Sequence, residues 1–217
     1  MHRGNYINGE FRESATQGTV LNPATGSVAG HVPLAGATEA LEAVEAAAAA
    51  QRAWARLPAI ERGNALRRFA AEIEARADAI GAALALESGK SPADARGEAI
   101  YGAELMRYHA EWARRIEGEI IPSDNPGETL LLRREAIGVV ACLIPFNYPV
   151  YTLVRKIARA LIAGGTPWWH ARAIPPRSRP LSSRARPMRR GCRPARSISS
   201  PCRMRWPNAS AATAPWG

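Results

Sequence analysis

Apolar side chains recur at helical spacing over the first half of the chain. From Thr38, the expected N-cap, through Ala55 they predict a helix. From Pro58 to Gly89 a second apolar stripe predicts one longer helix, because proline suits a first helical turn and glycine a helix end. We interpret both helices as scaffold.

A third helix is predicted from Ser91 to about Arg115. Ser91, Pro92 and Asp94 supply an N-cap, a first-position proline and a capping-box acid. Its expected buried face is Leu105, Tyr108 and Trp112. An aromatic stripe at this spacing is more often part of a core than of a cofactor site, so this helix too is interpreted as scaffold.

Three pairs of short extended segments are separated by turn residues. Asn8-Gly9 is a strong hairpin signal, and the turn at residues 22–26 lies between two apolar pairs. The third pair, residues 120–121 and 129–133, surrounds a turn-rich stretch. The first two pairs fit antiparallel edges on the outside of a larger body.

A continuous apolar run, Ile137 to Ile144, predicts a strand covered on both faces, as in parallel sheets. Pro145 ends the strand, and Pro149 opens a helix. The expected buried stripe of that helix is Leu153, Ile157 and Leu161. In such units ligands bind at the carboxyl end of the strand. The sequence therefore predicts an α/β fold with a candidate site at residues 145–149.

The loop Pro145-Phe146-Asn147-Tyr148-Pro149 resembles the Pro-Trp-Asn-Phe-Pro pattern of the NAD(P)-dependent aldehyde dehydrogenase superfamily. The Ile-Asn-Gly segment at residues 7–9 and the Asn-Pro-Ala-Thr-Gly turn at 22–26 are similar to that family's opening segment. The resemblance covers about residues 6–166. Residues 111–128 are most similar to the lactaldehyde and glycolaldehyde dehydrogenase branch.

The resemblance implies oxidation of a short (hydroxy)aldehyde, such as lactaldehyde or glycolaldehyde, to its acid with NAD, or with NADP. It implies that the Asn147 side-chain amide donates to the oxyanion formed by thiolate attack. It also implies that Ile144, Pro145, Phe146 and Asn147 neighbour the dinucleotide, and that Arg155 lies near a substrate carboxylate or hydroxyl. Taken alone, Asn147 is a turn residue between prolines and Arg155 a surface cation.

The resemblance divides the chain into four parts of an incomplete aldehyde dehydrogenase fold. Residues 1–117 would be the helical and edge-strand part of the cofactor domain, and 118–136 a hairpin arm. Residues 137–166 would begin a Rossmann-like sheet, and 167–217 form an Arg/Pro-rich tail unlike the family. Because the family's arm reaches a neighbouring subunit, we expect a homo-oligomer through it. Without sheet neighbours, the first strand would leave apolar faces bare.

Charge changes abruptly where the tail begins. Residues 1–165 hold 18 of the 29 basic and all 19 acidic residues, whereas residues 166–217 hold 11 Arg, no Lys and no acid. In the reading frame that starts at the third base of the Pro167 codon, the codons permit Val-Val-Ala-Arg-Pro-Ser-Asp, a strand like the family's. The Trp codons force only one Val and the Ala of this strand. Our hypothesis is that residues 167–217 are an out-of-frame translation, which resequencing of the locus tests.

The family's nucleophilic cysteine, glutamate base and glycine-rich pyrophosphate turn would all lie beyond the resembling part. Cys142 is mid-strand and is expected to be a small buried hydrophobe, while Cys192 and Cys202 lie in the tail. The family's chemistry is thiolate attack, hydride transfer to NAD and thioester hydrolysis. We therefore expect a truncated chain with an incomplete cofactor site that is inactive alone.

Composition excludes several other classes. The scattered cysteines and the four histidines suggest neither a disulfide framework nor a metal cluster, and suit a reducing cytoplasm. No secretory signal or membrane-length apolar run, roughly 20 residues, is present, so no membrane partner is expected. Two alternatives stay open: a noncatalytic fragment docking on homologous subunits, and an Arg- and Trp-rich nonspecific nucleic-acid binder, although no evolved nucleic-acid partner is expected.

Overall fold

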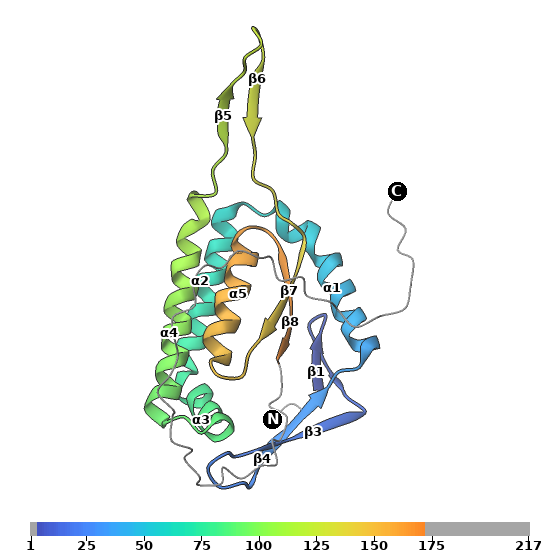
Figure 1. The fold of residues 1–217 in the computed structure, drawn as a ribbon, viewed down its shortest axis with the longest axis vertical. Coiled ribbons are helices and arrows are strands. Elements are labelled where there is room, and N and C mark those ends of the chain that lie inside the picture. The colour runs from blue at the N-terminus through green and yellow to red at the C-terminus, as the bar shows by residue number, and fades with distance from the viewer. Residues whose placement is uncertain (1–3, 172–217) are drawn as a thin grey trace, which may run out of the picture. The chain divides into compact units, whose positions relative to one another are not determined.

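The structure, a computed structural model, describes residues 4–171 of the 217 (Figure 1). The elements in chain order are β1 (Gly4–Ile7), β2 (Glu10–Glu13), β3 (Thr16–Leu21), β4 (Val28–Leu34), α1 (Ala37–Arg56), α2 (Ala59–Ala75), α3 (Ala77–Ser88), α4 (Pro92–Ala110), the 3-10 turn η1 (Glu111–Arg114), β5 (Glu119–Pro122), β6 (Thr129–Leu132), β7 (Val139–Ile144), α5 (Pro149–Ile162) and β8 (Thr166–Ala171). The predictions for Cys192, Cys202 and nucleic-acid binding by the tail lie outside the described residues.

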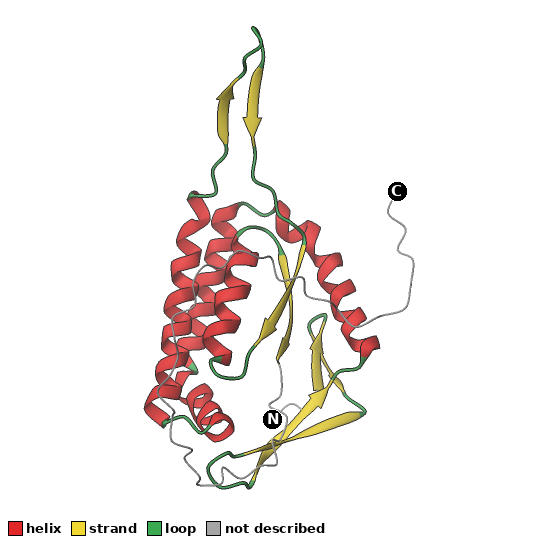
Figure 2. Cartoon of the chain, viewed as in Figure 1, coloured by secondary structure: helices red, strands yellow, loops and turns green. Residues whose placement is uncertain are grey.

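The strands between residues 4 and 171 form four two-stranded sheets (Figure 2). Three are the predicted antiparallel hairpins, β1–β2, β3–β4 and β5–β6. Asn8 and Gly9 both have positive φ, 52° and 85°, as the tight turn between β1 and β2 requires. At the next turn, the Asn22 side chain accepts the Ala24 N–H at 2.9 Å. Local turn chemistry thus places each hairpin.

Two of the predicted helix boundaries are wrong. Gly36 rather than Thr38 is the N-cap of α1, and the Glu39 carboxylate accepts the Gly36 N–H at 2.9 Å. The single helix predicted between Pro58 and Gly89 is two helices, α2 and α3, because Arg76 leaves helical geometry at φ −106° and ψ 13°. Gly89 ends α3 in the left-handed conformation, as expected for a glycine C-cap.

Helix α4 begins as predicted but buries a different face. Ser91 accepts the Asp94 N–H at 3.1 Å, and proline occupies the first turn. Tyr108 and Trp112, expected inside, are 57% and 40% exposed, and Leu105 is only partly buried. The face of α4 that packs against α2, α3 and α5 consists mainly of small residues, namely Ala95, Ala99, Gly102, Ala103 and Ala110, with Met106. Side chains this small let neighbouring helices approach closely.

Helix α5 packs on α4 and α2 and runs beside β7 and β8. Its buried stripe is shifted from the predicted one: Ile157 is buried, Leu153 and Leu161 are partly buried, and the remaining buried residues are Val154, Ala158, Ala160 and Ile162. Helix α2 contributes Leu66, Ala70 and Ile73 to the same core. One apolar core therefore joins α2, α4 and α5 to the strand β7.

The strand β7 differs from the prediction in two ways. It is not covered on both faces, because Cys142 and Ile144 are buried while Leu143 is 63% exposed, in line with the expectation that an incomplete sheet leaves apolar surface bare. It also keeps a neighbour, since β8 pairs with it in parallel from Thr166, opposite Val139, onward. Main-chain hydrogen bonds do not depend on side-chain identity, so residues 166–171 can pair with β7 whatever their side chains.

Arg62 is a buried cation between the ends of two helices. Its guanidinium donates to the carbonyl oxygens of Ile162 at 3.0 Å and Ala55 at 3.3 Å, and to that of Leu57. Burial lowers its pKa. Three carbonyl acceptors and the negative end of the α5 dipole compensate for the lost hydration, so Arg62 fixes the carboxyl end of α5.

None of the helices within residues 4–171 combines the length and the hydropathy that a membrane span requires.

The buried His109 predicts how stability depends on pH. Burial, and next the charge of Arg159, lower the pKa of His109 below its ordinary value of 6.5. The unfolded chain then takes up a proton at higher pH than the folded chain. Stability should therefore fall as pH drops below about 6.5, until the folded pKa is passed. Urea unfolding from pH 8 to pH 5 measures this.

A His109→Leu variant should flatten the His109-dependent part of that pH profile, because it removes the group that titrates. His31→Leu is the matched control, since His31 is exposed on β4. A profile for His109→Leu with the same slope as the parent chain would contradict the assignment.

Candidate functional site

The candidate loop lies where the sequence analysis predicts, between the carboxyl end of β7 and the first turn of α5. Ile144 is buried at 6% exposure, whereas Phe146 is 58% exposed. Pro145 and Asn147 are also exposed. Within residues 4–171 the Asn147 carboxamide has no hydrogen-bond partner, so its N–H groups are available to a ligand.

A carboxylate from α4 binds the end of this loop where α5 begins. Glu98 Oε1 accepts the backbone N–H groups of Val150 at 2.9 Å and Tyr151 at 3.1 Å, in the first turn of α5. The Glu98 side chain is only 1% exposed. A negative charge at this position also complements the positive end of the helix dipole.

Lys90 connects this carboxylate to the loop itself. Its ammonium group pairs with Glu98 Oε2 and lies 3.7 Å from the centre of the Tyr148 ring. A cation over an aromatic face is attracted by the ring quadrupole. Tyr148, which directly follows Asn147, is therefore held in place although it is 53% exposed.

The end of the loop that follows β7 is also bound to α5. Lys156 Nζ donates to the carbonyl oxygen of Leu143 at 2.6 Å, near the end of β7. Arg155, the predicted substrate contact, is exposed on the same helix, and the structure brings no site residue to its guanidinium. The structure thus gathers Ile144 to Asn147 with Glu98, Lys90 and Lys156, and leaves Arg155 apart.

The described residues fit only part of the dinucleotide cofactor that the family resemblance implies. Pro145 and Phe146 offer apolar surface to a flat ring. The N-terminus of α5, a common phosphate site in related folds, is already occupied by the Glu98 carboxylate. A pyrophosphate there would meet a negative charge, so the residues that hold it must lie elsewhere.

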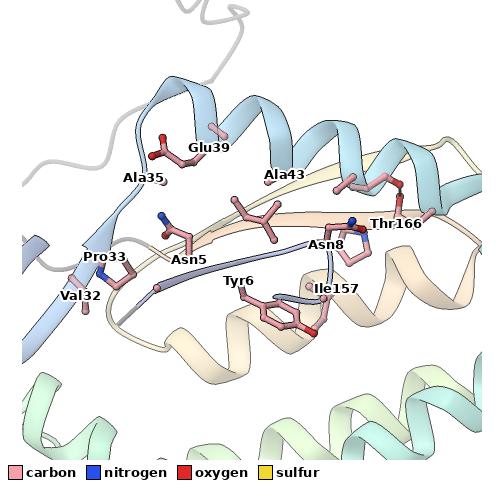
Figure 3. A pocket seen from close by; sticks show the side chains of 18 of the residues that line it. Asn5, Tyr6, Asn8, Val32, Pro33, Ala35, Glu39, Ala43, Ile157 and Thr166 are labelled. Atoms are coloured by element: carbon pink, nitrogen blue, oxygen red, sulfur yellow. Dashed lines mark hydrogen bonds between the residues drawn. The ribbon is translucent and has the colours of Figure 1, made fainter. Parts of the chain in front are cut away.

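A cavity of about 840 Å³ lies apart from the loop, between α1, β1, β4 and the inner side of α5 and β8 (Figure 3). Asn5, Tyr6 and Asn8 from the first hairpin line it, as do Ile157 of α5 and Thr166 of β8. Among the residues 4–171 that line it, the acidic ones are Glu39 and Glu87 and none is Lys or Arg. This space is large enough for a nucleotide but has the wrong charge for phosphates.

Cys142 is not placed as a nucleophile. It is fully buried on β7, and burial raises the pKa of its thiol, with Lys156 opposing that shift. A reactive cysteine requires a thiolate that a substrate can reach. The prediction that Cys142 is a buried hydrophobe is confirmed. No group of three or more potential metal ligands occurs among residues 4–171.

Comparison with known proteins identifies the class. A sequence profile described as the aldehyde dehydrogenase family matches residues 11–182. Lactaldehyde dehydrogenase of Escherichia coli K12 is 44% identical over 164 residues, which are 74% of this chain and 34% of that enzyme. Glutarate-semialdehyde dehydrogenase of Pseudomonas putida KT2440 is 40% identical over 163 residues, also 74% of this chain and 34% of the relative.

Solved structures give the same result for the fold. The crystal structure of lactaldehyde dehydrogenase from Escherichia coli matches with a TM-score of 0.73 at 43% identity, covering 76% of this chain and 35% of that one. An aldehyde dehydrogenase from Brucella melitensis biovar abortus 2308 matches with a TM-score of 0.75 at 38% identity, covering 77% and 35%.

This chain therefore belongs to the aldehyde dehydrogenase family, a family of oxidoreductases. Its fold is the N-terminal part of the aldehyde dehydrogenase fold. The chain spans about a third of the length of the curated relatives it matches.

Sequence reasoning missed Glu98 and Lys90. The available signal was Glu98, which lies at helical spacing between Ala95 and Gly102 on a face otherwise made of small residues. A charge at such a position requires buried partners.

The burial of Cys142 predicts slow alkylation. Iodoacetamide at pH 8 should label the Cys142 peptide roughly 100-fold more slowly in the native chain than in denaturant, because the thiol must first be exposed by opening of the structure. Peptide mass spectrometry separates it from Cys192 and Cys202. Equal labelling in both conditions would show that the thiol is accessible.

Proposed function

We propose that this chain supplies the oxyanion-donating loop and part of the dinucleotide floor of an enzyme that oxidises a short (hydroxy)aldehyde, such as lactaldehyde or glycolaldehyde, to its acid. The observation that carries the proposal is the Asn147 carboxamide. It is exposed, has no hydrogen-bond partner among the described residues, and lies on a loop whose two ends are both anchored to helices. The 44% identity to lactaldehyde dehydrogenase supports this substrate class.

In this proposal the Asn147 amide donates to the oxygen that becomes negative when a thiolate attacks the aldehyde. A fixed donor stabilises that charge without having to reorganise during the reaction. Ile144, Pro145 and Phe146 contact the dinucleotide next to it, and Arg155 is left as the less supported substrate contact. The bound nicotinamide would accept a hydride from the substrate.

The cofactor of this proposal is NAD, with NADP as the other candidate. Among similar structures, a glyceraldehyde-3-phosphate dehydrogenase from Bacillus halodurans C-125 is described as NADP-dependent and complexed with NADP; its TM-score is 0.74 at 33% identity, over 78% of this chain and 37% of that one. The pyrophosphate of either nucleotide needs residues other than the N-terminus of α5, for the electrostatic reason given above.

A chimera tests the role of Asn147. Residues 6–166 would replace the matching segment of Escherichia coli lactaldehyde dehydrogenase, and NAD reduction with lactaldehyde would be followed at 340 nm. Asn147→Ala should lower kcat by about 100- to 1000-fold, because one oxyanion donor is removed. Asn64→Ala, an exposed position on α2, is the matched control and should leave kcat unchanged. An Asn147→Ala chimera as fast as its parent would refute the role.

The 217-residue chain by itself should give no aldehyde-dependent NAD reduction, because its one described cysteine, Cys142, is buried. The expectation follows our hypothesis that residues 167–217 are read out of frame and therefore supply neither the nucleophile nor the base. NAD reduction that depends on this polypeptide and on a short hydroxyaldehyde would overturn the proposal of inactivity.

The hairpin β5–β6 is proposed as a contact with a second subunit. All eight of its strand residues are exposed, and the paired Ile120 and Leu131 are 76% and 73% exposed. Apolar surface of this kind is commonly covered by a partner.

Leu131→Glu should therefore weaken self-association of the chain roughly tenfold or more, because a charge would be buried at the contact. Sedimentation velocity over a concentration series measures this. Leu86→Glu is the control, since Leu86 is a 45% exposed leucine on α3, away from the hairpin. A parent chain that is monomeric throughout, or equal effects of both variants, would contradict the contact.

A further inference from the structure

We propose that Glu98 is a positioning residue for Asn147: from α4 it holds the first turn of α5 and, through Lys90, the aromatic ring next to Asn147. That this placement serves oxyanion binding by Asn147 rests on the proposed function. The contacts of Glu98 and Lys90 with this segment are observed independently of that function.

Helix α5 has no cap of its own. Its N-cap residue, Tyr148, makes no side-chain cap hydrogen bond, and no acidic residue lies in its first turn. Pro149 has no N–H, the next two N–H groups go to Glu98, and the Thr152 N–H donates to the Tyr148 carbonyl at 2.9 Å. Glu98 therefore accepts every first-turn N–H that the helix itself leaves unpaired.

The two carboxylate oxygens of Glu98 bind different groups. Oε1 receives both backbone N–H groups, and Oε2 pairs with Lys90. Lys90 in turn lies over the Tyr148 ring. One buried carboxylate thus restrains the residues from Tyr148 to Tyr151, and Asn147 is the next residue before them.

Glu98 itself is held rigidly. Its neighbours Ala95 and Ala99 on α4 are completely buried in the helix packing, so the carboxylate has little freedom to move. A cap within the loop would move with the loop, whereas a cap from a packed helix ties the loop to the core. Combined with the Lys156 contact to Leu143, it leaves residues 144–147 as a short span between two fixed ends.

The test uses the 217-residue chain and needs neither aldehyde nor cofactor. In Glu98→Met, which keeps the volume but removes the acceptor, the Val150 and Tyr151 amides should exchange about 10- to 100-fold faster with deuterium. The NMR order parameter of the Asn147 backbone amide should fall from about 0.85 toward 0.6 or below. Amides of Leu66 and Ala70 in α2 should be unchanged, which shows that the fold is retained.

Glu98→Gln keeps a carbonyl oxygen for the two N–H groups and should restore exchange to within about threefold of the parent, a rescue that a general loss of stability would not give. Glu104→Met, an exposed glutamate on the same helix, is the matched control. Unchanged exchange or an unchanged Asn147 order parameter in Glu98→Met, or no rescue by Glu98→Gln, overturns the proposal.

If Glu98→Met does not fold, Lys90→Met decides. It leaves the carboxylate on the α5 amides but removes its link to Tyr148, so a lowered Asn147 order parameter supports the proposal and an unchanged one overturns it. Because none of these measurements involves catalysis, they can fail while the chimera remains active, or succeed while it is inactive.

Discussion

Close approach of helices along α4 is the constraint on which the described structure depends. Ala95, Ala99, Ala103 and Ala110 have no exposed surface. A Cβ added at Gly81 of α3 would lie only 2.8 Å from the Arg96 Cα of α4, and one added at Gly102 would already be in van der Waals contact, at 3.5 Å, with side chains of α5. Interiors packed this tightly respond to the volume of a single methylene group. Because α5 lies against this face, a glutamate on α4 is close enough to reach the main chain of α5. A larger side chain on this face would move the candidate loop.

Helix α5 is held at both ends by buried charges from other helices. Glu98 meets its N-terminal N–H groups, and Arg62 meets the Ile162 carbonyl at its other end. The signs match the helix dipole, with the acid at the amino end and the base at the carboxyl end. The loop carrying Asn147 and the start of β8 lie just outside these two ends. The geometry of the proposed site is therefore set by side chains that do not belong to it.

Features governed by neighbouring residues were predictable. The Asn8-Gly9 turn, the Ser91 cap and the Gly89 helix end all follow from backbone preferences of those residues. The buried face of α4 was not predictable in the same way, because large apolar side chains score highest in a periodicity argument. Tyr108 and Trp112 lie outside, and alanines lie inside, since the distance between helices selects for volume as well as polarity.

By itself the sequence determined the α/β class, the hairpins, the strand–loop–helix unit and, through its resemblance, the loop in which Asn147 lies. Only the tertiary structure decided which faces are buried, that β8 pairs with β7, and that Glu98 caps a helix whose first donor is 52 residues away in the chain. The physical reason is the sequence distance over which each interaction acts. Turn and cap preferences act within a few residues, whereas a buried charge is understood only when the groups that compensate it are known.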